Sequence, residues 1–160
     1  MRMSKTISEL QLAPLMDVRA RELLHRFPMV VYSSGRRTLH EQAHAMAVNH
    51  IQDSGYLMRT YFHAAELLRA INLYSLPHSI DSVTDAIYWT LMDDSTLVKG
   101  PHLTGDAVDI VPMESVDGTP TPAGQEVIEW IKSCPDTTDF RTRENQLRRW
   151  HWACVPPVEI

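Results

Sequence analysis

This chain has few cysteines and no excess of positive charge. Its 160 residues include two cysteines, Cys134 and Cys154, which are too few for a disulfide scaffold or a thiolate zinc site. We therefore expect two free, partly buried thiols. Lysine and arginine number 15 against 20 acidic residues, so the formal net charge is −5. That balance argues against a general nucleic-acid binder, which would carry a basic patch or stripe.

Long apolar runs are also missing. No stretch of about 18 apolar residues exists, so we expect no stable membrane insertion. Residues 1–14 contain no apolar core of the kind that a Sec signal peptide needs, so we expect none. Repeats and low-complexity segments are absent as well. The length suits one domain over residues 1–160 with a real core, and we expect a monomer.

The hydrophobic periodicity predicts several helices and three short strands. Thr38 with Glu41 three residues later forms a capping box, which predicts a helix start at Leu39. Such a mixture indicates an α+β domain with a small, mostly antiparallel sheet flanked by helices. The segment 135–143 is polar and is expected to be a loop. The predicted strands are 29–33, 107–111 and 147–155, and the predicted helices are 13–27, 39–52, 57–72, 79–91 or 81–91, and 123–132.

The stretch from Pro101 to Pro112 carries the clearest chemical signal. His102 is expected on a loop, Gly105 permits a tight turn, and Asp109 lies seven positions after His102 inside a short apolar strand. A carboxylate buried there costs several kcal/mol unless a cation or hydrogen-bond donors face it. An imidazole and a carboxylate form a normal partial ligand set for Zn²⁺. A surface histidine with a strand-capping aspartate is the alternative.

A third ligand could come from His151 near the chain's end. Strand alternation places it on one face with Leu147, Arg149, Ala153 and Val155. That face would direct His151 towards the core or a cleft. Because Trp150 and Trp152 flank it, a packed core histidine is the alternative interpretation.

A competing metal motif lies in the helix after Thr38. His40, Glu41 and His44 form a formal H-E-x-x-H, in which two histidines four residues apart share a helix face and can hold Zn²⁺. The longer form of this motif needs a glycine where Ala47 stands, and no Met-turn signature follows. The alternative is an exposed helix face rich in histidine and glutamate.

Three segments resemble the zinc DD-/LD-peptidases of the Hedgehog/DD-peptidase fold, which include D-Ala-D-Ala carboxypeptidases and phage L-alanyl-D-glutamate endolysins. Residues 34–43, SGRRTLHEQA, are similar to that family's S-G-[YF]-R-T-x-x-E-Q-A block. Residues 102–109, HLTGDAVD, fit H-x-x-G-x-A-x-D at every fixed position. Residues 150–152, WHW, lie where the family keeps its last zinc histidine.

This resemblance implies roles for individual residues. His102, Asp109 and His151 would bind Zn²⁺ and leave the fourth position to water. Arg37 would lie by the cleft and hold a peptide carboxylate or polarise its carbonyl, which suits a guanidinium fork. Under this reading the H-E-x-x-H is accidental, and its helix makes structural contacts.

The general base and the chain between the motifs depart from the family pattern. The family places a carboxylate three residues before its last histidine, where this chain has Arg148. Glu144 is the nearest upstream carboxylate and is the expected base, with Asp139 and Glu159 as weaker candidates. The 65 positions from Arg37 to His102 are more than usual, so we expect a helical insertion at about 57–97.

The main functional expectation is a zinc-dependent peptidase that hydrolyses the stem peptides of bacterial peptidoglycan, as an endolysin or an LD-/DD-carboxypeptidase does. Such a protein would reside in the host cytoplasm before its release to the periplasm or cell wall. One alternative is a catalytically impaired, metal-binding virion or structural protein of the same fold. A second is a zincin-type protease that uses His40, Glu41 and His44.

Overall fold

A computed structural model describes residues 5–61, 64–75, 78–93, 101–144 and 147–155. Contacts within the chain divide it into two compact units, residues 1–36 with 104–160, and residues 37–103. The expected α+β class is confirmed, because the described residues form helices and one small antiparallel sheet. A Hedgehog-like topology stays a prediction, as does a single domain with an insertion at about 57–97. Among the described residues, no helix has the length and apolar character needed to cross a membrane.

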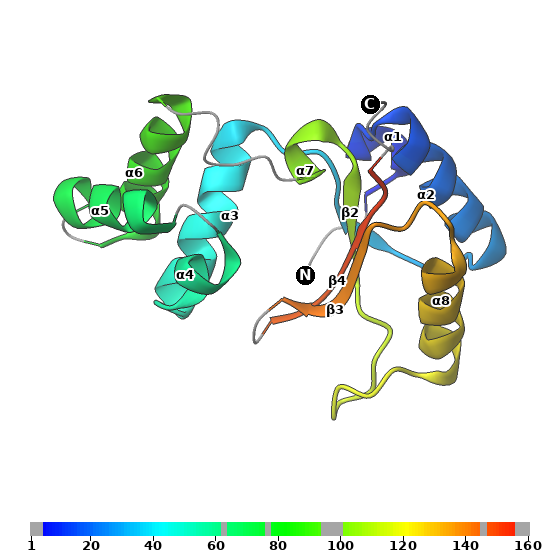
Figure 1. Ribbon diagram of the computed structural model, residues 1–160. Helices are drawn as coiled ribbons and strands as arrows, with labels where there is room; N and C mark the ends of the chain where they lie inside the picture. Colours follow the sequence, from blue (N-terminus) through cyan, green and yellow to red (C-terminus); the bar gives the residue numbers. More distant parts are fainter. Residues whose placement is uncertain (1–4, 62–63, 76–77, 94–100, 145–146, 156–160) are drawn as a thin grey trace. The chain divides into compact units, whose positions relative to one another are not determined.

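The first unit contains the sheet, whose strand order is β1-β2-β4-β3. All three neighbouring pairs are antiparallel. The strands are β1 (Tyr32–Ser34), β2 (Ala107–Ile110), β3 (Asp139–Glu144) and β4 (Leu147–Ala153). Three helices accompany the sheet, namely α1 (Ile7–Leu10), α2 (Pro14–Arg26) and α8 (Pro122–Ser133), and both α2 and α8 lie on the same side of it (Figure 1).

The sequence did not predict β3. Residues 135–143 are polar, which predicts a loop, but the chain from Asp139 to Glu144 forms a strand that pairs with β4. An edge strand with one solvated side needs no apolar alternation, so polarity concealed it. The order of the other three strands along the chain agrees with the sequence, with bounds that differ by at most three residues.

One face of the sheet packs into the core of the first unit. Trp150 and Trp152 are fully buried on that face, and their indole N–H groups donate to Glu114 and Thr137. Helix α2 supplies apolar side chains to the same core, and so does α8. Because successive strand residues point to opposite faces, Arg149 and His151 project from the other face of the sheet. The core residues are Leu10, Met16, Leu23, Tyr32, Val108, Ile110, Val127, Ile131, Trp150 and Trp152, among others.

The second unit is helical, with α3 (Leu39–Gln52), α4 (Tyr56–Thr60), α5 (Ala64–Tyr74) and α6 (Ile80–Asp93). The bounds of α3 match the prediction, and the Thr38–Glu41 capping box is present. The single helix expected over 57–72 is instead two, α4 and α5. The short helix α7 (Pro101–Thr104) spans the division between the two units. Buried Met46, Leu57, Leu67, Ile71 and Ile87 belong to this unit's core.

Candidate metal centre

Asp109 is buried on the sheet face opposite the core. Strand β2 is buried at all four positions, and Val108 and Ile110 point into the core while Asp109 points the other way. Its relative exposure is 2%. A carboxylate this deeply removed from water requires compensating charge or hydrogen-bond donors.

The turn that leads into β2 depends on Gly105. Its φ of +87° lies in the left-handed region, and a Cβ at this position would stand 2.8 Å from the backbone nitrogen of Ala13. The carbonyl of Gly105 accepts a hydrogen bond from that nitrogen at 3.0 Å. A glycine is therefore required both for the backbone conformation and for the close approach of residues 11–13, which precede α2.

His102 lies on α7 and not on a loop, which corrects the expectation from sequence. Its exposure is 7%, and its backbone carbonyl accepts a 2.9 Å hydrogen bond from the amide of Arg37. The turn containing Gly105 separates α7 from β2, so His102 lies on the helix and Asp109 on the strand of one short helix–turn–strand segment.

His151 is the register partner of Asp109 on the neighbouring strand β4. Its Nδ1 atom lies 3.3 Å from Oδ1 of Asp109, and its side chain is 13% exposed. The alternation predicted for β4 therefore holds, with Trp150 and Trp152 in the core and His151 on the opposite face.

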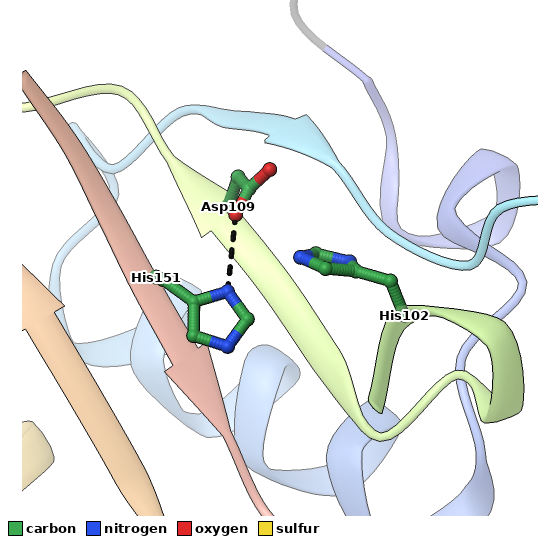
Figure 2. Close-up of side chains that lie close together, drawn as sticks. All are labelled: His102, Asp109 and His151. Atoms are coloured by element: carbon green, nitrogen blue, oxygen red, sulfur yellow. Dashed lines mark hydrogen bonds and ion pairs between the residues drawn. The ribbon is translucent and has the colours of Figure 1, made fainter. Parts of the chain in front are cut away.

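His102, Asp109 and His151 come together as the sequence predicted. Each offers one ligand atom, and these three atoms lie within 4.8 Å of one another. Figure 2 shows the ring of His102 directed towards Asp109, with His151 approaching the same carboxylate from β4. Among the residues the structure describes, they form the one group of this kind. Two imidazoles and a buried carboxylate are a donor set that suits a divalent metal ion, Zn²⁺ included.

The ligand spacing also fits a metal. Atoms bound about 2.0–2.1 Å from a tetrahedral zinc lie roughly 3.3 Å apart. The separation of Asp109 Oδ1 from His151 Nδ1 is 3.3 Å. This pair therefore already has the spacing that a tetrahedral ion requires.

Two further charged side chains border the group: Arg149, which was not assigned to it from sequence, and Asp139, which was a weaker candidate for the base. An Nη1 atom of Arg149 lies 3.8 Å from Oδ2 of Asp109, and Oδ2 of Asp139 lies 4.0 Å from Nε2 of His151. The alternation of β4 placed Arg149 on the face of His151 and could have indicated its contact. The approach of Asp139 depends on β3, which the sequence did not reveal.

Arg37 begins the helical unit close in sequence to α3. Its Nη1 atom donates to Oε1 of Gln42 at 3.2 Å, and Nε2 of Gln42 donates to the hydroxyl of Tyr61. Through its amide, Arg37 is also bonded to the carbonyl of His102. The arginine is therefore anchored to the helical turn that carries a predicted ligand, and its role in substrate binding stays a prediction.

The predicted base, Glu144, is the last residue of β3 and pairs with Leu147. Leu147 precedes His151 by four strand residues, which corresponds to about 13 Å along β4. Arg148, at the position where the resembling family has its carboxylate, donates from Nη1 to the carbonyl of Val116. Glu159 lies outside the described residues. Glu144 as general base stays a prediction.

The H-E-x-x-H residues make structural contacts. Glu41 completes the capping box by accepting from the amide of Thr38. The ring of His40 packs edge-on against Tyr88, with 5.4 Å between centroids, and Nδ1 of His44 lies 3.4 Å from the hydroxyl of Thr84. These contacts account for the three motif residues without a metal.

Both cysteines are free thiols, as the sequence predicted. Burial raises the pKa of Cys154 to about 12, and it raises the pKa of Cys134 as well. Thiols that hold their protons this firmly are poor nucleophiles and poor metal ligands. Neither cysteine belongs to the group of His102, Asp109 and His151.

Comparison of the chain with protein-family models, with curated proteins and with solved structures found no match in any of the three. Function is therefore inferred from the chemistry of the site.

Proposed function

We propose that this protein is a zinc-dependent peptidase that hydrolyses the stem peptides of bacterial peptidoglycan. The observation that carries the proposal is the convergence of His102, Asp109 and His151 within 4.8 Å of one another. Three protein ligands of this type, with the fourth position left to water, are the usual composition of a catalytic zinc site. The resemblance of residues 34–43, 102–109 and 150–152 to cell-wall peptidases supplies the substrate class.

In this proposal His102, Asp109 and His151 hold the ion. Zinc, when bound, supplies Lewis acidity that activates a water and polarises the scissile carbonyl. Arg37 binds the carboxylate of the peptide, for which its planar guanidinium offers two parallel donors. Glu144 is the proposed group that takes up a proton and returns it to the leaving amine.

A second candidate is a protein that binds the metal and does not cleave peptide. Its support is the residue at the base position, Arg148, which is a cation engaged with the carbonyl of Val116. The register of β3 and β4, which separates Glu144 from the level of His151, favours the same candidate. Loss of a general base costs about 10²–10⁴ in the rate of the affected step.

One experiment separates the two candidates. Purified protein loaded with Zn²⁺ is mixed with isolated peptidoglycan, and released peptides are identified by mass spectrometry before and after chelation. Peptide release that stops on chelation and resumes when zinc is returned supports the peptidase. Stoichiometric zinc binding without release supports the second candidate, and failure to bind zinc refutes both.

A further inference from the structure

A row of ionisable side chains crosses three strands on the face that carries the candidate metal centre. Arg149 lies 3.8 Å from Asp109, which lies 3.3 Å from His151. On the other side His151 lies 4.0 Å from Asp139, which forms a 2.9 Å ion pair with Arg141. The sheet fixes this order, since Asp109 and Arg141 are the register partners of His151 on its two sides. The row consists of Arg149, Asp109, His151, Asp139 and Arg141.

His151 is the centre of the row and faces a different carboxylate with each ring nitrogen. Nδ1 faces Oδ1 of Asp109 at 3.3 Å, and Nε2 faces Oδ2 of Asp139 at 4.0 Å. A neutral imidazole has one N–H and one lone pair, and the partner of one nitrogen decides the state of the other. A lone pair is needed at the nitrogen that binds a metal, and a proton is then held at the opposite nitrogen.

The two carboxylates are not equivalent. Asp109 belongs to the group of atoms that lie within 4.8 Å of one another, and among the described residues Asp139 does not. Asp109 is almost fully buried, while the side chain of Asp139 is 34% exposed and pairs with Arg141 through Nε. Asp109 is therefore positioned to bind the metal directly. Asp139 is positioned to contact His151, which is itself a proposed ligand.

We propose that Asp139 is a positioning residue for the metal centre. It stabilises a proton on Nε2 of His151, so that Nδ1 carries the lone pair that binds the ion. Arg141 restrains the Asp139 carboxylate beside the ring through its ion pair. Carboxylate partners of this kind fix the orientation of metal-binding histidines, and their loss costs about 10–100-fold in metal affinity.

This placement bears on the base as well. Asp139 faces the ring nitrogen that points away from Asp109, so it stabilises the far side of the imidazole. It is therefore assigned to His151 and not to the substrate. The inference rests on the metal-binding part of the proposed function and is independent of peptide cleavage.

Two measurements on the zinc-loaded protein test the proposal. Nitrogen-15 NMR of the histidine rings, with the His151 signals identified by their loss in His151→Gln, reports which nitrogen is protonated. The zinc dissociation constant is measured by competition with a chromogenic chelator for wild type, Asp139→Ala, Asp139→Asn and Asp139→Glu. Glu129→Gln serves as the control. It removes one negative charge, as Asp139→Asn does, but from an exposed residue of α8.

We expect Nε2 of His151 to carry the proton and Nδ1 to bind zinc. Asp139→Ala should weaken zinc binding about 10–100-fold. Asp139→Asn, which keeps an acceptor oxygen but loses the charge, should weaken it less, and Asp139→Glu should restore part of the loss. Glu129→Gln should bind zinc as the wild type does.

A proton on Nδ1 of zinc-loaded His151 would overturn the inference, and so would wild-type zinc affinity in a folded Asp139→Ala. Either result leaves the peptidase proposal standing. Conversely, a wild type that binds zinc through Nδ1 but releases no peptide refutes the peptidase and leaves the role of Asp139 intact. A wild type that binds no zinc refutes both.

Discussion

Asp109 and His151 face each other across the β2–β4 ladder, with Oδ1 of the first 3.3 Å from Nδ1 of the second. Their backbones are fixed by strand pairing, and Val108, Trp150 and Trp152 anchor the same strands in the core. Two of the three predicted ligands therefore need no rearrangement of a flexible loop to reach their spacing. A rigid scaffold of this kind lowers the ordering cost of binding an ion.

Asp109→Ala should abolish zinc binding, because it removes the only anionic ligand of the His102–Asp109–His151 group. His44→Ala is the matched test of the competing H-E-x-x-H motif and should leave zinc binding unchanged, since His44 contacts Thr84. Equilibrium dialysis with metal analysis measures both variants, and circular dichroism verifies their folding. If His44→Ala lost zinc and Asp109→Ala retained it, the metal site would be on α3 and not at Asp109.

Arg149→Gln should strengthen zinc binding. The guanidinium lies 3.8 Å from Oδ2 of Asp109, so it repels an ion bound to that carboxylate. A unit charge roughly 6 Å from a divalent ion costs about 1.4 kcal/mol even at the dielectric constant of water, which is about tenfold in affinity. Isothermal titration calorimetry with Zn²⁺ tests this expectation.

The same change should lower the thermal stability of the zinc-free protein, because Asp109 loses a compensating cation. Arg21→Gln is the control, since Arg21 lies on α2 and pairs with Asp17. Unchanged or weaker zinc binding in Arg149→Gln would show that the arginine does not act on the ion through its charge.

Gly105→Ala should destabilise the protein more than Gly118→Ala. Both glycines have positive φ, +87° and +85°, which costs a residue with a Cβ about 1–2 kcal/mol. A Cβ at Gly105 also meets backbone at 2.8 Å, whereas at Gly118 it meets the mobile ends of the Arg143 and Arg148 side chains. Thermal unfolding of the two variants measures the difference, and equal melting temperatures would contradict the steric argument.

His50→Gln should remove part of the loss of stability at acid pH. Burial lowers the pKa of His50 below its ordinary value of 6.5, and His78 lowers it further. Its Nδ1 atom is buried and has no hydrogen-bond partner among the described residues. Because the unfolded chain binds this proton more readily, stability is full above pH 6.5 and falls as pH decreases towards the folded pKa.

Urea unfolding of the zinc-free wild type and His50→Gln at several pH values checks this expectation. The stability of the variant should depend less on pH below the ordinary histidine pKa. Parallel curves for the two proteins would show that other groups account for the acid sensitivity.

The convergence of His102, Asp109 and His151 was predicted from local signals and from the resemblance of residues 102–109 and 150–152 to the cell-wall peptidases. The spacing of His102 and Asp109 about Gly105, and the two-residue period around His151, are both readable without tertiary contacts. The helix after Thr38 was predicted for the same reason, since its capping box lies within four residues. The structure agrees with these local signals because the conformation that each segment prefers is also the one that buries its apolar side chains.

Other features depend on contacts that the sequence does not display. Strand β3 is polar and pairs with β4, so the sequence named Asp139 only as a weaker candidate for the base and did not predict the strand that brings it near His151. The division into two units also follows from which residues contact one another, a property that composition does not reveal. Helix α7 is four residues long, which is too short for a hydrophobic period to show in the sequence.

The alternation of tryptophan and histidine along β4 restricts how this strand can evolve. Substitutions at its exposed positions leave the pairing intact, but inserting or deleting one residue before Trp150 would turn every side chain beyond it to the other face. An indole would then occupy the place of His151, and an imidazole would enter the core. Length changes in this segment should therefore be tolerated only in pairs of residues, and variation should accumulate by replacement instead.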